Sequence, residues 1–99
     1  MTGYSSIPEH MRDAMQRYIE NGIEPGGFLS AVLSNDLMGS LRKGDEINQA
    51  SLLAYARFLY NDAPSGCYGS HAAFVGWCES GGIAGIERRR NALTHEVTQ

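Results

Sequence analysis

The sequence has few residues of the kinds that hold small proteins together covalently. It contains two cysteines among 99 residues, which is too few for the disulfide framework of a small secreted domain. It also lacks the charged start and apolar run of a signal peptide, and it has no apolar stretch long enough to cross a membrane. We therefore expect a protein with reduced thiols that acts in the cytoplasm.

The chain also lacks an excess of positive charge. Its 8 Lys and Arg residues stand against 11 Asp and Glu residues, for a net charge of -3. Proteins that hold nucleic acid by bulk electrostatics need Lys and Arg to neutralise phosphates, so nucleic acid is the least expected partner. The run Arg88 to Arg90 is a local exception. It is typical of a solvated helix end, but it keeps a small DNA-binding regulator as a third hypothesis.

What the chain does contain is typical of one globular domain, with 42% hydrophobic and 19% charged residues. Apolar residues recur at helical spacing, and no alternating strand pattern is present. The sequence therefore predicts an all-α fold, a compact bundle of four to five short helices with no sheet. We expect a single helical domain over residues 1–91 and a frayed polar tail over residues 92–99.

Capping signals place the expected helices. The first runs from about Ile7 to Glu20, after a capping box at Ser6 to Glu9, and ends at Asn21-Gly22. The other four are expected at about residues 27–44, with a polar interruption at 34–36, and at about 45–60, 70–80 and 84–91, with Asp45 and Ser70 as N-caps. The second helix is expected to be the most buried element. The apolar faces of the second and third helices are expected to consist of Phe28, Leu29, Val32, Leu33, Leu37, Leu41, Ile47, Ala50, Leu53, Ala54, Phe58 and Leu59.

Three segments carry a resemblance to a known group of proteins. They are Ile7-Pro8-Glu9-His10-Met11, the stretch from Gly26 to Leu37 (GGFLSAVLSNDL), and Phe58 to Pro64 (FLYNDAP) with Gly66-Cys67-Tyr68-Gly69-Ser70. Over about residues 7 to 83 the chain resembles a set of small proteins found in tailed bacteriophages and prophages. The resemblance implies a phage accessory protein acting in the cytoplasm of a bacterial host. It carries over no catalytic or binding residue.

The loop from Tyr60 to His71 is the first candidate site. Successive amides from Gly66 to Ser70, together with the positive end of the following helix, form a potential anion site. Tyrosine rings beside it would stack on a base. The alternative is a tight structural corner, because no phosphate-loop lysine is present. The residues assigned here to ligand or partner binding, which include a polar pair from the second helix, are Asn35, Asp36, Tyr60, Asn61, Asp62, Ser65, Gly66, Tyr68, Gly69, Ser70 and His71.

Catalytic and metal chemistry have weak support in the sequence. Cys67, His71 and Cys78 are potential zinc ligands, but a structural zinc site needs a fourth, and only His10 or His95 remain. Cys67 with His71 is also a weak nucleophilic pair, since no orienting acid is evident. Nothing in the spacing demands that Asp36 meet Asp62 as an acid pair. We therefore expect no enzyme activity, no metal and no cofactor.

Three functions remain in order of preference. The first is inhibition of a bacterial host defence system by binding a protein component without catalysis, through an acidic surface that imitates nucleic acid. The second is sequestration of a small anionic nucleotide signal at loop 60–71, and the third is the DNA-binding regulator. Small subunits build enclosed pockets at shared interfaces, so a homo-oligomer is also considered, with Met1 and Tyr4 as an N-terminal arm. The expected acidic surface consists of Glu9, Asp13, Glu20 and Glu24.

Overall fold

A computed structural model describes residues 3–98 of the chain, with the side chains of residues 3–92. Helices account for most of this part, and no strand occurs in it, so the all-α prediction is confirmed. Within the described range there are more α-helices than the four to five expected. In chain order the elements are η1 (Gly3–Ser6), α1 (Glu9–Asn21), α2 (Gly27–Leu33), α3 (Leu37–Lys43), α4 (Glu46–Ala50), α5 (Leu52–Asp62), η2 (Ser65–Cys67), α6 (His71–Ser80) and α7 (Gly82–Thr98).

The expected second helix is divided into α2 and α3, because a helix C-terminus is followed directly by the N-cap of the next helix. Asn35 adopts the left-handed conformation, with φ of 64°, and the amide of Asp36 donates to the carbonyl of Ala31 at 2.8 Å. Glycine is the most common residue in the left-handed conformation at a helix C-terminus, and asparagine also occurs there. The Asp36 side chain then accepts from the amide of Gly39 at 3.0 Å and caps α3. The polar interruption is therefore a complete helix boundary.

The expected third helix is also divided, at Ser51, into α4 and α5. Asp45 caps α4 as predicted, because its carboxylate accepts from the amide of Asn48 at 2.7 Å. Ser70 caps α6 in the same way, accepting from the amide of Ala73 at 3.0 Å. Two of the predicted N-caps are therefore confirmed.

The start of α1 differs from the predicted capping box. The Ser6 hydroxyl donates to the carbonyl of Gly3 at 2.6 Å, and Pro8 is the N-cap, with no side-chain hydrogen bond. The residues before the helix form η1, so the hydroxyl closes that turn and does not reach the helix amides. Tyr4 packs against Phe58, with ring centroids 5.2 Å apart, and so covers its own chain. Met1 lies outside the described residues.

The core lies where α1, α2, α5 and α6 meet. Side-chain hydrogen bonds join α1 to α6 and to η2. The Tyr18 hydroxyl donates to the carbonyl of Cys67 at 2.7 Å, and the Trp77 indole donates to the carbonyls of Tyr18 and Ile19, each at 3.1 Å. These bonds pair the polar tips of two large side chains, whose bodies are buried in the core. They also hold η2 and α6 against α1.

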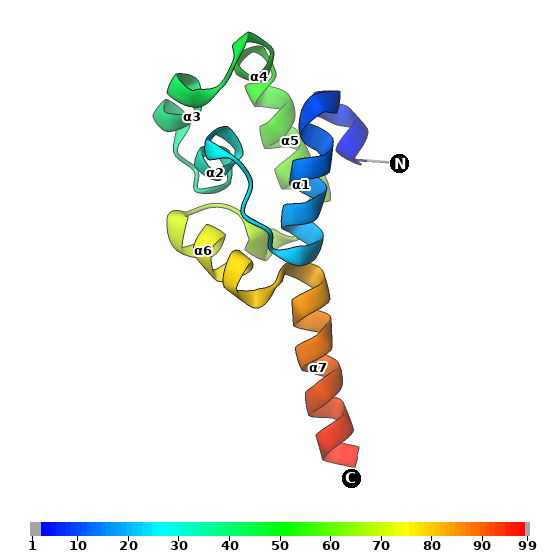
Figure 1. Cartoon of the computed structure of the whole chain (residues 1–99). Coiled ribbons are helices and arrows are strands. Elements are labelled where there is room, and N and C mark those ends of the chain that lie inside the picture. The colour runs from blue at the N-terminus through cyan, green and yellow to red at the C-terminus, as the bar shows by residue number, and fades with distance from the viewer. Residues whose placement is uncertain (1–2, 99) are drawn as a thin grey trace.

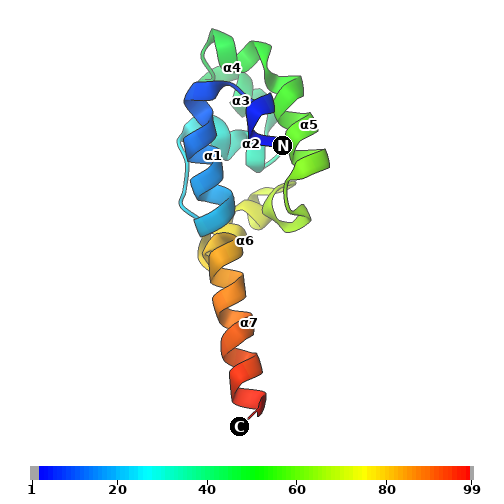
Figure 2. The same cartoon turned by 90° about the vertical axis from the view of Figure 1, so that its right-hand side faces the viewer.

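Helix α7 leaves this globule and projects from it (Figures 1 and 2). The expected fifth helix ended near Asn91, before a polar tail, whereas α7 runs to Thr98. Its first turn stays on the globule, where Ile83 and Ile86 pack against the core. Residues 87–92 are exposed. None of the helices over residues 3–98 is long and apolar enough to span a membrane.

The apolar faces predicted for the second and third helices are buried only in part. Phe28, Leu29, Leu33, Phe58 and Leu59 are in the core as expected. Other members of the same predicted faces are exposed, on α3, α4 and α5. The large apolar side chains that stay exposed on these three helices are Leu37, Met38, Leu41, Ile47, Leu53 and Tyr60.

Candidate functional site

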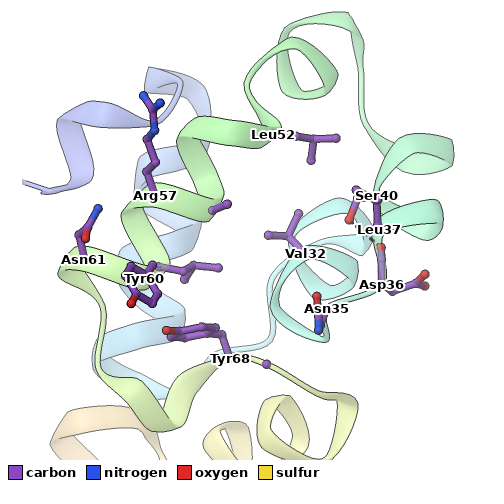
Figure 3. A pocket seen from close by; sticks show the side chains of 13 residues that line it. Val32, Asn35, Asp36, Leu37, Ser40, Leu52, Arg57, Tyr60, Asn61 and Tyr68 are labelled. Carbon is purple, nitrogen blue, oxygen red and sulfur yellow. Dashed lines mark hydrogen bonds between the residues drawn. The ribbon is translucent and has the colours of Figure 1, made fainter.

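A pocket of about 530 Å³ opens between α5 on one side and α2 and α3 on the other (Figure 3). We call it the α3–α5 groove. Its lining is mostly apolar. Val32 and Leu52 extend into it from opposite walls, and the Tyr68 ring lies at one end (Figure 3). The lining residues are Val32, Asn35, Asp36, Leu37, Ser40, Leu52, Ala56, Arg57, Leu59, Tyr60, Asn61, Tyr68 and Gly69.

The groove brings together two segments that are far apart in the sequence. Asn35 and Asp36 come from the α2–α3 boundary, whereas the other predicted members come from the end of α5 and from the turn after η2. The tie between them is a backbone hydrogen bond, in which the amide of Gly69 donates to the carbonyl of Leu33 at 3.0 Å. Of the residues assigned to binding from the sequence, those that line the groove are Asn35, Asp36, Tyr60, Asn61, Tyr68 and Gly69.

The polar groups of the groove differ in how far they are already engaged. Asp36 uses one carboxylate oxygen to cap α3, and the Ser40 hydroxyl donates to the Asp36 carbonyl at 2.8 Å. Within the side chains described, Arg57 has no ion pair and no side-chain hydrogen bond. Its guanidinium extends from α5 away from α2 and α3 (Figure 3), so this cation lies outside the apolar space between the two walls.

The amides expected to form an anion site are partly used within the fold. The Cys67 amide donates to the carbonyl of Pro64 at 3.2 Å, and the Gly69 amide is bonded to α2. The Ser70 hydroxyl serves the first turn of α6. The loop therefore has the contacts of a structural corner as well as an edge on the groove.

The remaining predicted loop residues lie elsewhere. Asp62 lines a second pocket, of about 410 Å³, together with Tyr4 and Phe58. Ser65, Gly66, Ser70 and His71 line neither of these two pockets. These residues are close in sequence to residues that line the groove, but they do not line it themselves.

The expected acidic surface is exposed but is not purely acidic. Glu9, Asp13 and Glu20 share one stripe of α1, at spacings of four and seven residues. Asp13 pairs with Arg17 at 3.0 Å, and Glu20 accepts from Gln16 at 3.1 Å. Glu24 lies beyond the end of α1. The pairing within the stripe lowers the negative charge that it presents to a partner.

The cysteine chemistry considered from the sequence is opposed by burial. Cys67 is fully buried, and desolvation raises the pKa of its thiol to about 12. A thiol that stays protonated at neutral pH is a poor nucleophile and a poor metal ligand. Among the residues described, no three His, Cys, Asp or Glu side chains gather in a way that would hold a metal ion. The side chain of His95 lies outside the described set.

Sequence reasoning missed part of the groove. Arg57 was not considered, although it stands three residues before Tyr60 and four before Asn61 and so shares their face of α5. Leu37 was assigned to the core, yet it lines the groove and is 62% exposed. The spacing of Arg57 to Tyr60 and Asn61 is the signal for Arg57. The helix boundary at Asn35-Asp36 is the signal for Leu37, because Leu37 begins a separate helix there.

Comparison of the chain with protein-family models, with curated proteins and with solved structures finds no match in any of the three.

Proposed function

We propose that this protein is a phage accessory protein that inhibits a bacterial host defence system by binding a protein component, without catalysis, through the α3–α5 groove. The observation that carries the proposal is the convergence of Asn35, Asp36, Tyr60, Asn61 and Tyr68 on one mostly apolar groove. The phage and host-cytoplasm setting comes from the resemblance of the sequence motifs, which contribute both walls of that groove.

The surroundings of the groove favour a protein partner. Leu37 and Met38 are each 62% exposed on α3, and Tyr60 is 82% exposed on α5. Leu37 and Tyr60 also line the groove. Exposed apolar side chains beside an apolar groove favour an interaction surface, because their burial by a partner removes them from water. A tyrosine at such an edge supplies a large contact area together with a polar tip.

The proposal is tested with a substitution that fills the groove. Ala56→Trp adds a large side chain to an exposed groove position, and Ala72→Trp makes the same change on the exposed surface of α6, outside the groove. Each form is expressed in bacterial strains that carry one defence system each, and phage plaque formation is scored. Where the wild-type protein restores plaques, Ala72→Trp should also restore them and Ala56→Trp should not. A complex of the wild-type protein with a component of that defence system should appear in size-exclusion chromatography.

Full activity of Ala56→Trp, with its fold checked by circular dichroism, would show that the groove is not the binding surface. Restored plaques without any protein complex would contradict the protein-binding mode.

A second candidate is capture of a nucleotide signal in the same groove. It is favoured by Tyr60 and Tyr68, which line one pocket, since their rings can stack on a base. Isothermal titration with a panel of cyclic nucleotides tests it. Binding that Tyr68→Ala abolishes would support this candidate, and a flat response across the panel would remove it.

A further inference from the structure

We infer that α7 is an interface between two copies of this chain, which pair through their projecting helices in antiparallel orientation. The occupant of this surface is thus a second copy of the same protein. The inference goes beyond the proposed function and does not depend on it, because none of the described α7 side chains lines the α3–α5 groove.

The first observation is the length over which α7 stands away from the globule. Beyond Ile86 the helix projects without another helix beside it (Figures 1 and 2), and the side chains of residues 87–92 are exposed. An isolated helix shorter than about 12–15 residues is marginal in water, because most helical stability in proteins comes from the packing of one face. The section of α7 from residue 87 to Thr98 therefore needs a second surface to pack against.

The second observation is a mostly apolar stripe that begins on the globule and continues along the projecting section. Its positions follow each other at alternating spacings of three and four residues, which is the a and d pattern of a coiled coil. Ile83 and Ile86 begin the stripe and are half-buried against the core. In full the stripe consists of Ile83, Ile86, Arg90, Leu93 and Val97. This spacing favours pairing with another helix along the length of α7.

Arg90 favours one orientation of the pair. Two parallel copies in register would place each position of the stripe against itself, so that Arg90 would meet Arg90 of the second copy as a like charge. In an antiparallel pair a positions face d positions, which puts Arg90 opposite Leu93 of the second copy and Ile86 opposite Val97. The aliphatic stem of an arginine packs on apolar surface while its charged head reaches water. The antiparallel pair therefore covers the stripe without opposing like charges.

The charges beside the stripe are complementary in the same register. Arg89 and Glu96 both occupy g positions, which face one another across an antiparallel pair. Arg89 of each copy thus faces Glu96 of the other, and the twofold symmetry of the pair makes this contact twice. Arg89 has no ion pair among the described side chains. Neither residue has an oppositely charged residue three or four positions away in its own helix, so the second copy supplies the partner of each.

Sedimentation velocity of the full chain over a series of concentrations tests the pairing. The monomer has a mass of 10.8 kDa, and we expect the weight-average mass to rise toward twice this value as the concentration increases. The interface is short, so the dimer should dissociate on dilution.

Leu93→Ala tests the stripe. It should weaken the dimer about tenfold or more, because two apolar side chains leave the centre of the interface. Alanine favours a helix more than leucine does, so this loss does not come from helix propensity.

Charge reversal tests the register. Arg89→Glu should weaken the dimer about tenfold, because two ion pairs become two like-charge contacts. Combining Arg89→Glu with Glu96→Arg restores opposite charges at both contacts and should recover the wild-type affinity. Arg88→Glu makes the same change of net charge at an f position, on the side of α7 away from the stripe, and should leave the affinity as in the wild type.

A mass that stays at 10.8 kDa across the series would overturn the pairing. A dimer that Leu93→Ala leaves unchanged would show that the interface lies elsewhere on the molecule. A dimer that the double variant does not recover, or that Arg88→Glu weakens as much as Arg89→Glu does, would overturn the antiparallel register.

Discussion

Replacing Gly82 by alanine tests the contact that joins α7 to the rest of the molecule. Gly82 begins α7 with φ of +70°, and its backbone lies against the end of α1. A Cβ atom added there would come within 2.6 Å of the Gly22 nitrogen and 2.7 Å of the Asn21 nitrogen. Both are backbone atoms, so no flexible side chain can move aside. The variant must therefore shift one helix against the other.

The expected cost has two parts. The left-handed conformation costs a residue with a Cβ about 1–2 kcal/mol. Overpacking against atoms that cannot move adds about 1–3 kcal/mol. Gly82→Ala should thus lower the free energy of unfolding by about 2–5 kcal/mol, which is a large part of the stability of a typical small domain.

Two other glycines provide matched controls. Gly69 also has a positive φ, of 117°, but a Cβ there would meet nothing within 4 Å, so Gly69→Ala should cost only the conformational part. Gly76 lies inside α6 with open space around it, and Gly76→Ala should stabilise the protein by about 1 kcal/mol through helix propensity. Alanine restricts the unfolded chain similarly in all three variants, and φ of 117° at Gly69 is no easier for alanine than φ of 70° at Gly82, so an excess loss for Gly82→Ala comes from the contact.

Urea unfolding followed by circular dichroism gives the midpoint and slope for each variant. The predicted order of stability is Gly76→Ala, wild type, Gly69→Ala and Gly82→Ala. Equal losses for Gly82→Ala and Gly69→Ala would refute the reasoning, because they would mean that α1 and α7 do not meet at this glycine.

Three further predictions concern buried polar groups. Trp77→Phe leaves the carbonyls of Tyr18 and Ile19 without their shared donor and should destabilise the protein by about 1–3 kcal/mol in urea unfolding, and an unchanged midpoint would contradict these hydrogen bonds. Asn48→Ala removes the acceptor of the buried Tyr55 hydroxyl, 2.6 Å away, and should cost a similar amount; adding Tyr55→Phe should recover part of it in a double-mutant cycle, and simple additivity would argue against the pair. Because burial raises the pKa of Cys67 to about 12, the unfolded chain loses this proton first, so stability should be complete below about pH 9 and should fall as the pH rises from 9 toward 12. Urea midpoints measured from pH 8 to 10 should fall less steeply for Cys67→Ala, and identical slopes would place the thiol in water.

Much of the fold could be predicted because its signals are local. A helix begins where a side chain satisfies its first amides, as at Asp45 and Ser70, and ends where a residue adopts a left-handed conformation, as at Gly22. Both depend on a few neighbouring residues. The buried stripe of α1, with Met15, Tyr18 and Ile19, follows in the same way from helical spacing.

The errors arose where two local signals stood side by side. The low helix propensity of Ser34, Asn35 and Asp36 predicts a weak point within one helix, but Asn35 ends α2 and Asp36 caps α3. Serine is a common N-cap residue, but the Ser6 hydroxyl donates to the carbonyl of Gly3 within η1. In each case the sequence allowed two hydrogen-bonding partners, and the path of the chain chose between them.

The sequence predicts which segments carry the candidate site, and tertiary packing decides which of their residues line one groove. The polar residues near 35 and 60–69 were recognisable from the sequence, because asparagine, aspartate, glycine and tyrosine interrupt otherwise apolar helices. That six of them share one groove, while Asp62, Ser65, Gly66, Ser70 and His71 do not, depends on the hydrogen bond from Gly69 to Leu33 and on the direction in which α3 leaves α2.

The sequence by itself therefore determined the all-α class, the main helix ends and the buried face of α1, since each depends on contacts between residues a few positions apart. Only the tertiary structure decided that Leu37 and Leu53 stay exposed, that Arg57 forms no ion pair among the described side chains, and that α7 projects from the globule. These features depend on which distant surfaces meet, and helical spacing alone does not specify the partner of an apolar face.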